Sequence, residues 1–253
     1  MAPPTSVRLG PLGLAIANGA RWLNDDEYPA WQQYADELER LATFVIREGQ
    51  FDSYLGRLQG RRNERDSALA ELRVAFHFDA NGFRITQWRP VGADATEGEF
   101  AVAGPSGTGT FVEVKSPGWE GELSDEEKRK GRTRLPKYLP FEGRAVAPWE
   151  RIQFSVKKSY KKLTPTRPNL LIIADDLFVS LRHGTEMHAG QALYEARSNG
   201  CFAGSKFQNL GGVAIFWEED VGAYYMKLFL NRFALPSTSL PDDMRARFGG
   251  QTL

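Results

Sequence analysis

The 253-residue chain carries 32 lysines and arginines against 32 aspartates and glutamates, so its formal net charge is zero, and 42% of its residues are hydrophobic. This composition is typical of a globular protein and excludes a uniformly basic coat for nucleic acid, but it leaves room for a local basic surface. The single cysteine excludes an internal disulfide framework and favours a reducing compartment, with the cytoplasm as the default. No segment approaches the ~18 consecutive apolar residues of a membrane span, and the N-terminus lacks the basic start of a secretory signal, so we expect no membrane partner.

The N-terminal part predicts a helical layer. Over residues 25–50, apolar and aromatic side chains recur at spacings of three and four, which is typical of an amphipathic helix; they are Tyr28, Trp31, Tyr34, Leu38, Leu41 and Val45. A second helical run, ERDSALAELRVAFHFDANG, ends at Gly82, a common helix stop. Within it Glu71 is in line with Ala68, Ala75 and Phe78, so we expect this carboxylate to point toward the core, where it needs a partner.

The next segment predicts three short strands, FRITQW, EFAVA and TFVEVKS. The turn-rich GPSGTG between the last two indicates a hairpin. If its turn is centred on Ser106, residues whose numbers sum to 212 face each other, so Glu99 faces Glu113. Opposed carboxylates are destabilising, so this arrangement asks for a cation, which Lys115 or a divalent metal would supply.

The second half predicts a long polar loop over residues 117–148, then a helix that starts at Pro148 with an apolar stripe and basic outer faces. NLLIIADD reads as a strand buried on both faces, and GGVAIFW and YYMKLFL as further strands. We therefore predict a single α/β domain over residues 1–253 with a mixed central β-sheet flanked by helices. Its parts are an N-terminal helical part (1–64), a core (65–180), C-terminal strands and helix (181–235) and a loose tail (236–253).

The predicted elements come in a definite order: a helix with Glu71, a strand entering at Glu99, a hairpin, the E-V-K of Glu113 to Lys115, a basic helix and an apolar strand. This order resembles the PD-(D/E)XK nuclease superfamily, with its restriction-endonuclease-like core. The resemblance covers about residues 65–180. It implies an endonuclease that hydrolyses phosphodiester bonds of DNA, or as a second choice RNA, with Mg²⁺ or Mn²⁺. Glu99 and Glu113 would bind the metal, Lys115 would act on the attacking water, and Glu71 would assist.

The carbonyl oxygen of Val114 could supply a further ligand, because hard oxygen donors suit Mg²⁺. The sequence departs from the family where Pro-Asp is usual, since Gly98 and Glu99 stand there. The nearest aspartate, Asp94, would lie on the opposite strand face from Glu99, so we favour Glu99 for that role.

From Lys128 to Lys162 cations far outnumber the two acidic residues, so this stretch could attract a polyanion. We expect contacts to the nucleic-acid backbone from Gln153, Lys157, Lys158, Lys161, Lys128, Arg129 and Lys130. Cutting both strands of a duplex would favour a homodimer. Two alternatives stay open: a binding module that keeps the nuclease fold without its chemistry, and an interaction protein in which Glu113 and Lys115 form a structural ion pair.

Overall fold

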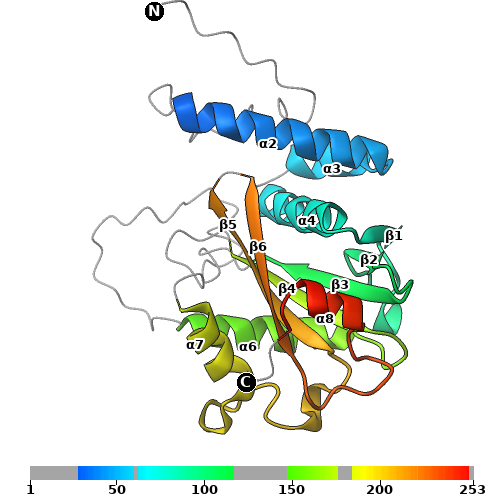
Figure 1. The fold of residues 1–253 in the computed structure, drawn as a ribbon, viewed down its shortest axis with the longest axis vertical. Helices are drawn as coiled ribbons and strands as arrows, with labels where there is room; N and C mark the ends of the chain where they lie inside the picture. Colours follow the sequence, from blue (N-terminus) through cyan, green and yellow to red (C-terminus); the bar gives the residue numbers. More distant parts are fainter. Residues whose placement is uncertain (1–27, 60–61, 117–146, 176–183, 221, 251–253) are drawn as a thin grey trace, which may run out of the picture.

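A computed structural model describes residues 28–59, 62–116, 147–175, 184–220 and 222–250. A six-stranded sheet runs through it in the chain order β1 to β6 (Figure 1). The strands are β1 (Arg84–Trp88), β2 (Phe100–Ala103), β3 (Gly109–Lys115), β4 (Asn169–Asp175), β5 (Gly212–Asp220) and β6 (Ala223–Leu230). The helices are α2 (Tyr28–Arg47), α3 (Phe51–Leu58), α4 (Arg62–Ala80), α6 (Pro148–Ser159), α7 (Thr185–Ala189) and α8 (Asp242–Arg247). Short turns of 3₁₀ or π-helix complete the description: η2 (Ala93–Ala95), η3 (Tyr160–Lys162), η4 (Gly190–Tyr194), η5 (Ala196–Ser198) and η6 (Ser205–Phe207).

The sheet is mixed, which confirms the predicted fold class. Strands β1, β2 and β3 pair antiparallel, β3, β4 and β5 pair parallel, and β5 and β6 pair antiparallel. Strand β4 therefore has a parallel neighbour on each side and packs on both faces, which explains its continuous aliphatic sequence. Helix α4 covers one face of the sheet and α6 the other (Figure 1).

The hairpin register is the predicted one. Phe100 pairs with Val112 and Ala101 with Phe111, and the numbers of each pair sum to 212. The peptide N–H of Glu99, one residue before β2, donates to the carbonyl oxygen of Val112 at 3.2 Å. Glu99 is thereby held beside the inner strand β3.

Each face of the sheet has its own apolar core. On the α4 side, Phe78, Val112 and Val114 belong to one buried cluster, whereas on the α6 side Phe111 and Val156 belong to another. This division follows from the alternation of side chains along β3. By the same alternation, Glu113 shares the α6 side with Phe111, so the strand carries a carboxylate within an apolar layer.

A buried ion pair ties the N-terminal helix to the sheet. Glu37 of α2 is 1% exposed, and the guanidinium of Arg73 on α4 donates to both of its carboxylate oxygens, at 2.8 and 3.0 Å. The hydroxyl of Tyr224 on β6 donates to the same carboxylate. Leu38, Leu41 and Val45, predicted on the apolar stripe of the first helix, are fully buried.

The prediction of a loose tail from Pro236 is wrong for residues 236–250. Helix α8 lies against the α4 side of the sheet, where Met244 and Phe248 are buried in the core. The ring of Phe248 lies 5.4 Å from those of Phe78 and Phe83, centroid to centroid. A six-residue helix is too short to show a period in the sequence, and its attachment depends on these aromatic contacts rather than on helix propensity.

The predicted loop over residues 117–148 lies outside the described residues except for its last two positions, and so do Lys128, Arg129 and Lys130. In the described part of the chain, no helix combines the length and the apolar character that crossing a bilayer requires.

Candidate active site

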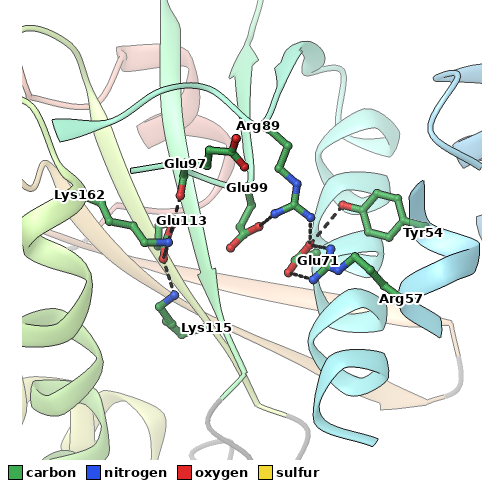
Figure 2. Close-up of polar contacts among 9 residues, drawn as sticks. All are labelled: Tyr54, Arg57, Glu71, Arg89, Glu97, Glu99, Glu113, Lys115 and Lys162. Carbon is green, nitrogen blue, oxygen red and sulfur yellow. Dashed lines mark hydrogen bonds and ion pairs between the residues drawn. The ribbon is translucent and has the colours of Figure 1, made fainter. Parts of the chain in front are cut away.

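Glu113 is the centre of the first half of the site. Its side chain is completely buried, and both Lys115 and Lys162 place their ammonium groups on one carboxylate oxygen, Oε1, with Lys162 at 2.8 Å (Figure 2). The other oxygen, Oε2, is buried and has no hydrogen-bond partner among the described residues. A buried carboxylate oxygen without a partner is costly, so Oε2 marks a place where a donor or a cation would be stabilised.

Lys162 was not among the residues singled out from the sequence. It lies in η3, the turn that follows α6, and its ammonium also donates to the carbonyl oxygen of Glu97 at 3.0 Å. Burial of Ile152 and Val156 holds α6 on the sheet and so brings η3 to the end of β3. In the sequence Lys162 is one cation in a basic run, and nothing local distinguishes it from its exposed neighbour Lys161.

Glu71 and Glu99 form the second half of the site, bridged by Arg89. The guanidinium of Arg89 lies 2.6 Å from Glu99 and 3.6 Å from Glu71 (Figure 2). Glu71 is 4% exposed and is also held by Arg57 of α3, one of whose nitrogens donates to Oε1 at 2.6 Å. Tyr54 of α3 donates to the same carboxylate at 3.4 Å. Glu71 therefore points inward, as its helical position predicted, and its partners come from the N-terminal helices.

Two backbone features position Glu99. Arg89, just after β1, has a φ of 51°, which a side chain with a Cβ rarely adopts, and its N–H donates to the carbonyl oxygen of Glu99 at 3.0 Å. Gly98 packs directly on the ring of Phe111, where an added Cβ would lie 2.3 Å from a ring carbon. Only glycine lets the chain approach the inner strand this closely before Glu99. Strained backbone of this kind is often found at functional sites.

The surroundings of Glu99 alter its acidity. Burial is the main cause that raises the pKa of Glu99 from 4.5 to about 7, and the neighbouring carboxylates of Glu71 and Glu113 raise it further, while Arg89 and Lys115 oppose them. Glu99 therefore exchanges a proton near neutral pH. The two halves of the site share one electrostatic field, because Glu113 and Lys115 act on Glu99.

The charges of the site nearly balance. Three buried carboxylates, Glu71, Glu99 and Glu113, stand against four cations, Arg57, Arg89, Lys115 and Lys162. Within the described ranges, no three histidine, cysteine, aspartate or glutamate side chains gather as a metal cage.

The donors are nevertheless of the kind that Mg²⁺ uses, because this ion usually takes one or two carboxylates and completes its shell with water and substrate. The unpartnered Oε2 of Glu113 fits such an ion. Glu99 is engaged by Arg89, and Val114 turns its side chain into the core on the α4 side.

The other predicted site residues lie outside this cluster of charges. Lys157, Lys158 and Lys161 are exposed on the outer side of α6 and η3. Gln153 is only 6% exposed, and its amide donates to the carbonyl oxygen of Ser198 at 2.7 Å, so its placement does not support the predicted phosphate contact. Asp94 lies in η2, away from the strand position that Glu99 extends.

Comparison with known proteins identifies no family for the chain and one similar solved structure. No family model and no curated protein matches the chain. Among solved structures, the chain is similar to one described as SfsA of Pyrococcus furiosus in complex with Ca²⁺, with 13% sequence identity and a TM-score of 0.25. The similarity covers 65% of this chain and 60% of that one. The chain thus spans about three fifths of the length of the protein it matches.

Proposed function

We propose that the protein is a metal-dependent nuclease that hydrolyses phosphodiester bonds of DNA, with RNA as the less favoured substrate. The observation that supports this most directly is Glu113, a fully buried carboxylate with two lysines on one oxygen and none on the other. A purely structural ion pair at this depth would be expected to satisfy both oxygens.

Under this proposal, Glu113 and Glu99, with the carbonyl oxygen of Val114, would hold a Mg²⁺ or Mn²⁺ ion. When bound, the ion supplies Lewis acidity toward a phosphate oxygen and lowers the pKa of a bound water. Lys115, whose ammonium is already fixed on Glu113, orients the attacking water and stabilises negative charge that develops on the phosphate. Lys162 helps to orient the carboxylate of Glu113 through its contact with Oε1, and Glu71 orients Arg89.

The test is a nuclease assay on supercoiled plasmid, single-stranded DNA and RNA with Mg²⁺, Mn²⁺ or EDTA. Lys115→Met should lower the cleavage rate by at least about 10²-fold, the usual effect of removing one group that stabilises developing charge. Lys227→Met is the matched control, because Lys227 of β6 also pairs with a glutamate, Glu186, which belongs to α7 and is exposed. Unchanged cleavage by Lys115→Met would contradict the assigned role.

A non-catalytic module that keeps this fold is the second candidate, and one observation favours it. Arg57 and Arg89 already neutralise Glu71 and Glu99, as expected if the carboxylates serve only to join α3, α4 and the hairpin. Titration calorimetry with Mn²⁺ separates the two functions. A nuclease should bind the ion and lose this binding in Glu113→Gln, whereas a non-catalytic module should release no heat in either protein.

A further inference from the structure

Phe154 is an exposed aromatic residue on a helix that otherwise buries its apolar side chains. Its side chain is 65% exposed, the largest value among the large hydrophobic residues of the described chain, whereas Ile152 and Val156 of the same helix are fully buried. Exposure of a phenylalanine forgoes the stabilisation that burial would give. A single exposed apolar residue is common, so its surroundings decide whether it has a role.

The surroundings of Phe154 are basic. Lys157, Lys158 and Lys161 follow it at three, four and seven positions, spacings that place all four side chains on one side of α6 and η3, and all four are exposed. Glu150, the acidic residue of α6, serves as a helix cap, because its carboxylate accepts the N–H of Ala147 at 3.0 Å. Three lysines therefore lie on the same side of the helix as the exposed ring, and the ammonium of Lys157 also donates to the side-chain oxygen of Gln153 at 3.4 Å.

The basic edge leads to the candidate active site. Lys162 directly follows Lys161, and its ammonium lies 2.8 Å from Glu113. From Phe154 to Lys162 the chain rises by about 12 Å along the helix axis, at ~1.5 Å per residue. A ligand that contacts Phe154 and follows the lysines would therefore arrive at the buried carboxylate.

We propose that Phe154, Lys157, Lys158 and Lys161 form a binding site for a single-stranded nucleic acid, in which Phe154 stacks on an unpaired base and the lysines contact the flanking phosphates. Every base presents an aromatic face, so stacking on phenylalanine tolerates any sequence. In a duplex these faces are covered by neighbouring base pairs, and a side chain reaches them only where a step is unstacked, which costs free energy. The inference rests on the nucleic-acid substrate of the proposed function and narrows it to strands with unpaired bases.

The experiment measures binding in EDTA, where a metal-dependent nuclease does not cut. Fluorescence anisotropy of a labelled 20-nucleotide single strand and of the matching duplex is compared for the wild type, Phe154→Ala, Phe154→Leu and Phe154→Trp. Loss of one stacked base weakens binding by about tenfold. We expect this loss on the single strand for Ala and Leu, little change for Trp, and no change on the duplex for any variant. Ile46→Ala is the control, because Ile46 is 55% exposed on α2, on the far side of the molecule (Figure 1).

The lysines give an independent readout. Neutralising Lys158 and Lys161 together should reduce the slope of log affinity against log salt by about 1.4, since each phosphate contact on a single strand contributes ~0.7. Phe154→Ala should leave this slope unchanged, because stacking releases no counterions. One salt titration series therefore distinguishes the stacking residue, whose loss changes the affinity, from the two phosphate contacts, whose loss changes the salt slope.

Several results would overturn the inference. The first is that wild type and Phe154→Ala bind the single strand with equal affinity. The second is that Phe154→Ala loses as much affinity for the duplex as for the single strand. The third is that Phe154→Leu keeps the single-strand affinity of the wild type as fully as Phe154→Trp does. Binding to vesicles of phosphatidylserine and phosphatidylcholine that Phe154→Ala abolishes, with oligonucleotide binding unaffected, would assign the surface to a membrane instead. If the protein binds single strands through Phe154 but never cuts them, the proposed nuclease function is refuted and the proposed binding site is not.

Discussion

The raised pKa of Glu99 predicts how stability changes with pH when this side chain is made neutral. In the folded protein Glu99 gives up its proton near pH 7, whereas an ordinary glutamate does so near pH 4.5. Between these values the folded state binds more protons than the unfolded state, so the free energy of unfolding falls as the pH rises. The contribution of Glu99 to stability is fully present below pH 4.5 and is lost as the pH rises through about 7.

The size of the effect follows from the two pKa values. The difference between 4.5 and about 7, at ~1.36 kcal/mol per unit, is about 3 kcal/mol. Glu99→Gln lacks this titration and keeps a side chain of nearly the same shape next to Arg89. Whatever its stability at pH 4.5, the variant should therefore gain about 3 kcal/mol relative to the wild type by pH 8.5.

Urea unfolding followed by circular dichroism at several pH values, with EDTA present, measures this difference. Arg89→Met serves as a second background, because Arg89 is the main cation that lowers the pKa of Glu99, and its removal should extend the loss of stability to higher pH. A stability difference between Glu99→Gln and wild type that stays constant from pH 4.5 to 8.5 would refute the reasoning, as would a change of opposite sign.

Three other predictions test the packing and the site. Arg73→Met should lower the free energy of unfolding by about 3–5 kcal/mol in urea unfolding, because it leaves the carboxylate of Glu37 buried without a cation. Phe248→Ala should cost about 3–5 kcal/mol by the same measurement, and should make the chain beyond Leu240 cleavable by protease if α8 is held by this ring. If Glu99 is a metal ligand as proposed, Arg89→Met should bind Mn²⁺ more tightly than wild type in calorimetry at a pH above the pKa of Glu99, since Glu99 loses a competing cation; equal affinity would contradict that competition.

Much of the sheet could be predicted from the sequence, because its signals are local. The turn centred on Ser106 determines the hairpin register, and the paired residues sum to 212 as expected. The continuous apolar run of β4 indicated a strand with neighbours on both sides. The attachment of α8 could not be predicted in this way, because it depends on Phe248 meeting Phe78, far away in the chain.

In the candidate site, too, local sequence signals could be predicted and contacts between distant segments could not. The inward position of Glu71 was predicted from the period of its helix, and the place of Glu113 beside Glu99 was predicted from the hairpin register. The cations opposite them were missed, because Arg57 belongs to a separate helix and Lys162 arrives from a turn after α6. Arg89 was also missed. Its position depends on a positive φ, which an arginine in the sequence does not indicate.

Helix α8 has a consequence for the order in which the molecule is completed during its synthesis. Helix α4 carries Glu71 on one turn and Phe78 on another. The ring of Phe78 contacts that of Phe248, which lies about 170 residues later in the chain. A nascent chain that has not yet produced α8 leaves the α4 side of the sheet open, and such distant contacts form slowly. The aromatic side chains of this face, Phe78 and Phe83, therefore gain part of their cover only after the segments that carry Glu71, Glu99 and Glu113 have been made.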